Sequence, residues 1–310
     1  MSTATTRQQL SSGRPVADRY GLGGLTGARM KVPLNKTFSI LVGTPNSGKS
    51  FLLQSNPDAF IINIDGSSTT YPEPKASLWP GWNEAGEPVD GHGNHVNLTW
   101  EEIDKKLKQI LEMDPAARPK TVIFDSLSLM TRVVQDKIIR EHEGKRYWKD
   151  LDGRYAWDYM GDVILEAANS LRRAGVGVIF TAHMVNKYLP VGENQNVQVW
   201  TVQCNDNLFR KIFPAAEFIA VLSPKWTTET KQIVTVVKGH RIPKTVSKKV
   251  LKYQLCVRHP DSEFSKCRRA VPSVIDIPTK DPWTYLETIY NEAPDLDSEA
   301  ASLPEEETTE

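Results

Sequence analysis

The sequence predicts an α/β fold with a mainly parallel central sheet, helices on both faces, an antiparallel edge and a small C-terminal extension. Three observations support this class. Short apolar runs that end in polar residues alternate with amphipathic stretches, which is typical of strands joined by helices in a parallel sheet. The first apolar run, residues 38–42, leads directly into a glycine-containing loop and a helical stretch. A later run, residues 232–237, alternates apolar and polar residues, as an antiparallel edge strand does.

Length and composition favour one large domain with additions. The chain has 310 residues, with 38 basic and 38 acidic side chains and a formal net charge of zero. A chain of this length can bury a large apolar core without disulfides. We expect a flexible N-terminal segment over 1–35, an ordered core over 36–243, a small basic extension over 244–290 and a disordered acidic tail over 291–310.

Charge is unevenly distributed towards the C-terminus. Residues 238–269 contain ten Lys and Arg against two acidic residues, whereas residues 294–310 contain seven acidic residues and no basic one. This asymmetry predicts either a polyanionic partner for which the tail competes, or two solvated stretches.

Nothing in the sequence predicts a membrane protein. No apolar run approaches the ~20 residues of a membrane span, and the N-terminus lacks the apolar segment of a secretory signal. The chain has three cysteines, and their wide spacing favours reduced thiols. We therefore expect a cytoplasmic protein with no membrane partner.

The loop after the first apolar run has the pattern GxxxxGK[ST] between a strand and a helix, as a phosphate-binding loop requires. Backbone N–H groups of such a loop converge on an anion, and glycines allow the tight curl. We expect this loop and Phe51 to bind ATP, with Lys49 reaching the β- and γ-phosphates and Ser50 ligating Mg²⁺. The loop residues are Gly43, Thr44, Pro45, Asn46, Ser47, Gly48, Lys49 and Ser50.

A second stretch, Thr121-Val122-Ile123-Phe124-Asp125-Ser126, reads as a buried strand ending in a carboxylate. Such a strand is typical of a Walker B motif, whose Asp holds Mg²⁺ beside the hydroxyl of the phosphate loop. The motif is weak alone, because many buried strands end in Asp. Its position about 75 residues after Lys49 favours the pairing of Asp125 with Ser50.

The intervening stretches supply the remaining elements. A strand over 59–65 ends in Asp65, and residues 66–97 are expected to form a surface excursion. Thr99 and Glu102 form a capping-box pattern that starts a helix over 100–113. Further helices are predicted over 127–142 and 155–173, and a parallel strand over 176–183.

Beyond that strand the patterns become weaker. Residues 186–207 are polar and read as a long irregular loop, which is usually functional. A short amphipathic piece follows over 208–213. Strands over 218–222 and 232–237 are expected to pair as a hairpin, turning through Pro224 and Thr227-Thr228.

A basic and aromatic cluster lies between the two predicted helices. It contains Lys145, Arg146 and Trp148. Cations beside stacking rings are what single-stranded nucleic acid requires. The alternative is a solvated loop with a buried Trp.

The ordered stretches resemble the RecA-like ATPase core and, more narrowly, the phage RecA-like single-strand-annealing ATPases. The resemblance covers residues 37–243. It rests on GTPNSGKS, IINID, TVIFDS, the helix with Tyr155-Ala156-Trp157-Asp158 that leads to IFTAH, and VVKGHR. It implies a RecA-like P-loop NTPase core, Mg²⁺ and ATP, single-stranded DNA, a homo-oligomeric ring or filament, and host cytoplasm if the protein is phage-encoded. A single-strand-binding protein is a further expected partner.

The resemblance also implies roles for individual residues. Asp65 stands where the family has a catalytic acid, more often Glu, that activates water. His183 matches a γ-phosphate sensor that leads into a DNA-contacting loop containing Lys187. Lys238 and Arg241 resemble cations that reach a neighbour's γ-phosphate. The alternatives are a capping Asp, a satisfied strand-end His and solvated cations.

These features are compatible with three alternative functions. The first is a DNA-stimulated ATPase acting in recombination, repair, replication or annealing. The second is a helicase-like or packaging motor. The third is an ATP-dependent binding switch with little turnover, which the Asp at position 65 favours because it is one methylene shorter than Glu.

Overall fold

A computed structural model describes residues 31–64, 77–78, 98–192, 195–237, 240–258 and 265–295. The strands are β1 (Phe38–Gly43), β2 (Ala59–Asn63), β3 (Ser77–Leu78), β4 (Thr121–Asp125), β5 (Gly177–Gly192), β6 (Gln195–Val202), β7 (Phe218–Val237), β8 (His240–Cys256), β9 (Lys266–Cys267) and β10 (Val274–Ile277). The helices are η1 (Leu34–Lys36), α2 (Lys49–Gln54), α3 (Trp100–Glu112), α4 (Leu127–Glu141), η2 (Trp148–Asp150), α5 (Gly153–Arg173), α6 (Asp206–Ala215) and α7 (Pro282–Glu292).

The predicted fold class is confirmed. The sheet runs in the order β10-β8-β7-β1-β5-β4-β2-β3, with β6 paired to β5 and β9 to β7. Strands β7, β1, β5, β4, β2 and β3 are parallel neighbours, whereas β8 and β10 form an antiparallel edge. The N-terminal strand β1 therefore lies inside the sheet, between β5 and β7.

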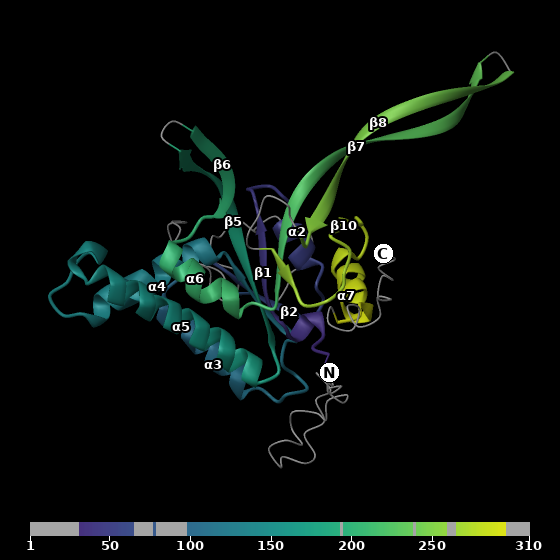
Figure 1. Ribbon diagram of the computed structural model, residues 1–310. Helices are drawn as coiled ribbons and strands as arrows, with labels where there is room; N and C mark the ends of the chain where they lie inside the picture. The colour runs from purple at the N-terminus through teal and green to yellow at the C-terminus, as the bar shows by residue number, and fades with distance from the viewer. Residues whose placement is uncertain are drawn as a thin grey trace, which may run out of the picture. The chain divides into compact units, whose positions relative to one another are not determined.

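Helices cover both faces of the sheet (Figure 1). Alternate residues of β1 divide between two apolar clusters, as strand geometry requires. Phe38, Ile40 and Val42 belong to the cluster that includes residues of α3, α4, α5 and α6, whereas Leu41 belongs to the cluster with α2 and α7. Burial on both faces explains why these strands read as continuous apolar runs.

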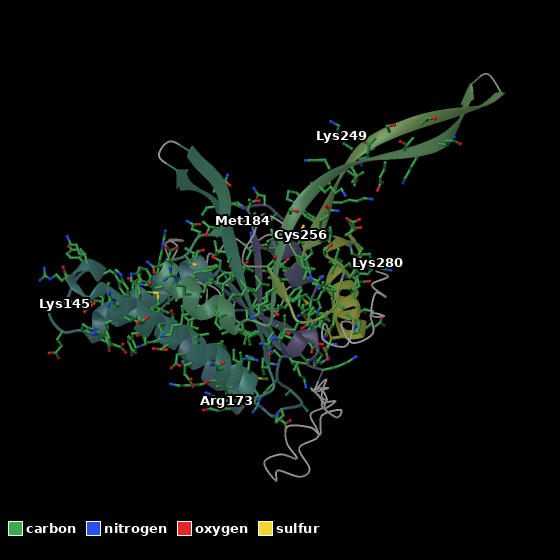
Figure 2. The ribbon with its side chains drawn as sticks, in the orientation of Figure 1. Lys145, Arg173, Met184, Lys249, Cys256 and Lys280 are labelled. Atoms are coloured by element: carbon green, nitrogen blue, oxygen red, sulfur yellow. The ribbon has the colours of Figure 1, made fainter. Side chains whose placement is uncertain are left out.

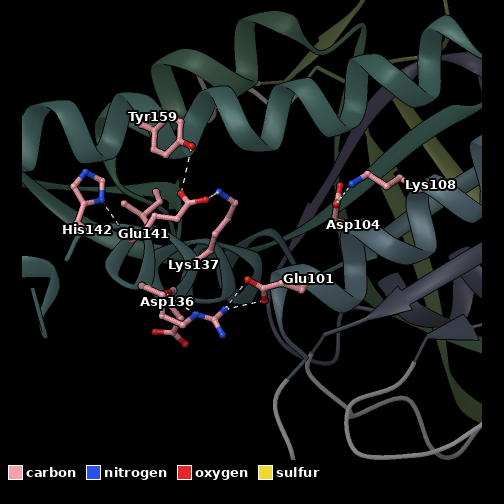
Figure 3. A network of polar contacts seen from close by, with 10 residues as sticks. Glu101, Asp104, Lys108, Asp136, Lys137, Glu141, His142 and Tyr159 are labelled. Atoms are coloured by element: carbon pink, nitrogen blue, oxygen red, sulfur yellow. Dashed lines mark hydrogen bonds and ion pairs between the residues drawn. The ribbon is translucent and has the colours of Figure 1, made fainter. Parts of the chain in front are cut away.

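Helix α3 begins as the capping box predicted. Thr99 Oγ1 accepts the Glu102 N–H at 3.3 Å, and the Glu102 carboxylate accepts the Thr99 N–H at 2.7 Å. Polar contacts then join α3, α4 and α5 on their outer side (Figure 3), where Arg140 pairs with Glu101 at 2.9 Å. Both partners are more than half exposed, so this pair adds little, at most about 1 kcal/mol. The apolar contacts beneath dominate the packing.

The prediction of a long polar loop over 186–207 is wrong. Strand β5 continues through it and turns into β6, with pairing from Met184 opposite Val202 to Gly192 opposite Gln195. The helix α6 then starts at Asp206, within the predicted loop. Residues 196–199 do alternate polar and apolar, but the Gly and Asn residues just before them favour a loop and outweighed this short run.

The prediction of a hairpin within residues 218–237 is also wrong. Those residues form one strand, β7, which pairs with β8 from Val221 opposite Cys256 to Val237 opposite His240. Pro224 is tolerated because β7 has a partner on one side only at that point, and edge positions accept Pro. The predicted boundary at residues 243 and 244 falls inside β8.

The long strands β5 to β8 form two arms. The β1–β7 register ends at Val42 opposite Val221 and the β1–β5 register at Gly43 opposite His183, yet β5 and β7 both continue. The hairpins β5–β6 and β7–β8 therefore leave the sheet at its carboxyl edge, one on each side of β1 (Figure 1). None of the helices in the described part of the chain is long and apolar enough to cross a membrane.

Candidate functional site

The loop between β1 and α2 lies at the carboxyl edge of the sheet, between the two arms. Close contacts require the two glycines of the loop pattern, Gly43 and Gly48. A Cβ on Gly43 would lie 2.4 Å from Ser47 Oγ and 2.6 Å from the Leu222 carbonyl oxygen. Gly48 has φ 90°, and a Cβ there would lie 2.6 Å from the Tyr253 ring. The loop can therefore adopt this curl only with glycine at both ends.

The Lys49 ammonium group is held against this loop. It donates to the carbonyl oxygens of Gly43 and Thr44, both at 2.9 Å, and to Ser47 Oγ at 3.4 Å. The side chain is buried, and its charge is thus fixed beside the curled backbone. This is the position from which a lysine can contact phosphate oxygens at the loop.

Asp125 lies beside the loop, as the sequence predicts. Its Oδ2 accepts the Ser50 hydroxyl at 3.3 Å, and its Oδ1 accepts the Thr181 hydroxyl at 2.5 Å. Strands β4 and β5 are parallel neighbours with Phe124 opposite Phe180, so the next residue of each strand brings the Asp and the Thr side by side. Thr181 was not singled out from the sequence; the signal was a polar residue inside the buried run of β5.

Asn63 is a second residue that sequence reasoning missed. It ends β2 in register with Asp125 and has 0% exposure. Neither its amide oxygen nor its amide nitrogen has a hydrogen-bond partner among the described residues, and the same holds for Ser126 Oγ. Buried polar groups are normally paired. These orphaned groups, together with the glycine-lined loop, fit a polar ligand such as a nucleotide with its Mg²⁺.

Replacing Asn63 with Leu should stabilise the nucleotide-free protein by about 1 kcal/mol, because an unpaired buried amide is removed at similar volume. The same change should reduce the additional stabilisation by ATP and Mg²⁺. Thermal melts with and without Mg²⁺·ATP measure both effects. Asn56→Leu is the matched control: Asn56 Oδ1 accepts the Asp58 N–H at 3.1 Å, so this variant should be less stable. A destabilised Asn63→Leu protein would contradict the assignment of Asn63 as an unpaired buried amide that serves the nucleotide.

An aromatic pair borders the loop on its other side. Tyr253 from β8 meets Gly48, and its ring lies 5.8 Å from that of Phe51, at an interplanar angle of 32°. Phe51 is 41% exposed. Tyr253 comes about 200 residues after the loop, and only the pairing of β8 with β7 brings it there.

His183 ends the parallel part of β5, opposite Gly43. It lines a pocket of about 530 Å³ with Ser128, Asn186 and Gln203, at the base of the β5–β6 arm. Cys204 also lines this pocket, and burial raises the pKa of its thiol to about 12. The thiol thus stays protonated at neutral pH, and the pocket offers hydroxyl, amide and imidazole groups together with the charged side chains of Arg132 and Asp206.

Several predicted residues lie outside what the structure describes. Asp65 and Lys238 fall outside the described residues, and only the backbone of Lys187 and Arg241 is described. The backbone places Lys187 in β5, within the β5–β6 arm, and Arg241 in β8, one residue after the start of that strand.

The cluster of Lys145, Arg146 and Trp148 is not brought to the nucleotide loop. Figure 2 shows Lys145 at the end of the α4–α5 pair that is remote from Met184, where the β5–β6 arm begins. Lys145 and Arg146 are exposed, but Trp148 is only partly so and packs edge-on against Trp157 at 5.0 Å. The exposed ring of this loop is Tyr147, at 62%.

Similarity to known proteins identifies a family for most of the chain. Residues 36–266 match a family described as AAA domain. Solved structures with similarity include the flagellar accessory protein FlaH from Methanocaldococcus jannaschii, at 13% identity and a TM-score of 0.31, covering 79% of this chain and 86% of that one. A KaiC-like protein from Pyrococcus horikoshii gives 14% identity and a TM-score of 0.32, covering 79% and 91%. The search of curated proteins gives no match.

Proposed function

The chain belongs to the AAA domain family, and from this premise we propose that it has a RecA-like P-loop ATPase core and acts as a DNA-stimulated ATPase of the recombinase or single-strand-annealing type. Its substrates are ATP with Mg²⁺, and its polymer is single-stranded DNA. The family assignment supports ATPase activity; the DNA-dependent role is our proposal.

One observation carries the proposal. The strand that ends in the nucleotide loop is flanked by two strands that both continue beyond the sheet as hairpins. The base of each arm lies at the nucleotide loop. His183 lies opposite Gly43 and immediately before Met184, where β5 begins to pair with β6. Tyr253 of β8 lies against Gly48. A change at the nucleotide can thus move either arm, which is how nucleotide binding can order a polymer-binding surface.

The nucleotide site can be assigned residue by residue. Ser50 and Asp125 would hold Mg²⁺, which supplies charge neutralisation to the phosphates when bound. Lys49 binds the β- and γ-phosphates, and Thr181 orients the Asp125 carboxylate through its hydroxyl. Asp65 orients and deprotonates the attacking water, and His183 responds to the γ-phosphate.

The length of β7 supports the trans role that we propose for Lys238 and Arg241. From Val221, its last residue paired with β1, to Val237 the strand covers roughly 50 Å at about 3.3 Å per residue. The backbone of Arg241 lies opposite Val236 near this far end, a long way from the nucleotide loop of its own chain. In our proposal Lys238 and Arg241 act on the γ-phosphate of a neighbouring copy, and the active protein is a ring or filament.

ATP hydrolysis measured with and without single-stranded DNA tests the proposal. We expect single strands to raise kcat severalfold and duplex DNA to raise it less, because the arms order around an unpaired strand. Phosphate release with homopolymer oligonucleotides, using RNA and duplex DNA as controls, gives the measurement. Translocation on duplex would instead identify a motor, and tight ATP binding without turnover a binding switch.

A further inference from the structure

The β7–β8 arm leaves the sheet as a two-stranded ribbon with solvent on both faces. We refer to residues 225–232 of β7 paired with residues 245–252 of β8 as the ribbon. A two-stranded hairpin without further packing is only marginally stable in water. The ribbon projects away from the helices (Figure 1), and most of its side chains are exposed. A partner that covers one face would stabilise it.

One face of the ribbon has a large exposed ring. Trp226 is 68% exposed and has no ring or hydrogen-bond partner among the described residues. It pairs with Leu251, and the next row on that face, two residues on, holds Thr228 and Lys249. Thr230 and Ser247 follow, with their hydroxyls 3.3 Å apart. This face thus presents a flat ring, an ammonium group and hydroxyls in successive rows.

The same face continues back to the nucleotide loop. Tyr253 pairs with Pro224, one row before Trp226, and strand alternation places both rings on one face. Tyr253 in turn lies against Gly48. A ligand on the Trp226 face is therefore connected to the nucleotide loop through adjacent rows on one face of the paired strands β7 and β8.

The ribbon is strongly basic. Its described side chains include five lysines, at positions 225, 231, 248, 249 and 252, against the single acid Glu229, which pairs with Lys252 at 3.1 Å. Lys225 stands directly opposite Lys252, and like charges in that position are unfavourable in isolation. By strand alternation these two lysines, with Lys231 and Lys248, lie on the face opposite Trp226, and Lys249 lies on the Trp226 face.

We propose that the ribbon binds a single-stranded polynucleotide, with a base stacked on Trp226 and a flanking phosphate held by Lys249 on the same face, while the four lysines of the opposite face attract the rest of the strand. Base stacking on an exposed ring beside cations is the general mode of sequence-tolerant single-strand binding. A second copy of the ribbon fits less well, because two faces of the same charge repel. The inference rests on the proposed function and names the surface that it uses.

Fluorescence anisotropy of a 5′-labelled single-stranded oligonucleotide tests this surface. Trp226→Ala should weaken binding about tenfold, the loss expected for one stacked base. Tyr285→Ala is the matched control, since Tyr285 is an exposed ring on α7, at 44%, and should leave affinity unchanged. Lys249→Ala should lower the slope of log affinity against log salt by about 0.7, whereas Lys105→Ala, on an exposed part of α3, should not.

The outcomes separate the ribbon from the proposed function. Equal affinity of Trp226→Ala and wild type, in a protein whose ATPase responds to single strands, would overturn the ribbon site alone. A Trp226→Ala protein that loses self-association but keeps its oligonucleotide affinity would make the ribbon a contact between copies, which also overturns it. Wild type that binds neither DNA nor RNA single strands would overturn both proposals. Thermal melting checks that each variant is folded.

Discussion

Replacing Asp125 with Asn should reduce kcat for ATP hydrolysis at least a hundredfold while the fold is retained. The carboxylate charge is lost at the position where Mg²⁺ and the phosphates develop charge, and removing one such group costs about 3–4 kcal/mol of transition-state stabilisation. The amide of Asn can still contact the hydroxyls of Ser50 and Thr181, so packing is preserved. Asp58→Asn is the control, because Asp58 forms only an exposed pair with Lys120.

The same variant reports whether the site is shared between copies. Arg241→Ala should also be inactive, because the neighbour's γ-phosphate loses its cation. Mixing the two inactive proteins should restore hydrolysis, since an Arg241→Ala nucleotide loop can then meet an Asp125→Asn arm. Phosphate release from the mixture, compared with each protein alone, is the measurement. Full activity of Arg241→Ala by itself would show that the arm supplies no catalytic cation.

Replacing Gly48 with Ala should destabilise the protein by about 2–4 kcal/mol and weaken ATP binding at least tenfold. Two costs add: about 1 kcal/mol for a side chain at positive φ, and about 1–3 kcal/mol for a methyl group forced into the Tyr253 ring. Gly175→Ala is the matched control, because Gly175 has φ 81° and nothing within 4 Å of its Cβ position. It should show only the first cost.

A double variant separates the two costs. In a Tyr253→Ala background the ring is absent, so Gly48→Ala should cost no more than Gly175→Ala does. Urea denaturation and binding of a fluorescent ATP analogue give the stability and the affinity. If Gly48→Ala lowers stability and ATP affinity equally with and without Tyr253, the contact of Tyr253 with the loop is not the reason that position 48 requires glycine.

The parts of the site that could be predicted lie close together in the sequence or end an apolar strand. The loop from Gly43 to Ser50 is recognisable because a strand, two glycines and a Lys-Ser pair are adjacent in the chain. Asp125 could be predicted because a buried parallel strand places its final residue at the ligand-binding edge. The buried strands and the capped helix α3 followed from apolar runs and a capping box, which are local signals.

Thr181, Asn63 and Tyr253 could not be assigned in this way. Each reaches the site from a different strand, and the strand order that brings them together is set by long-range pairing. The two arms escaped prediction for a related reason. Both arms contain short alternating runs, over 196–199 and 232–237, but the polar residues around these runs have no apolar periodicity. The length and pairing of the arm strands could therefore not be predicted.

The sequence by itself determined the phosphate-binding loop, the acidic strand end and the α/β class, because these depend on backbone conformation and burial within short segments. Only the tertiary structure decided that the loop lies between two projecting arms, that Tyr253 closes on Gly48, and that Trp226 shares a face with it. These relations depend on the register of β7 with β8, which couples residues through hydrogen bonds between strands rather than through neighbours in the chain.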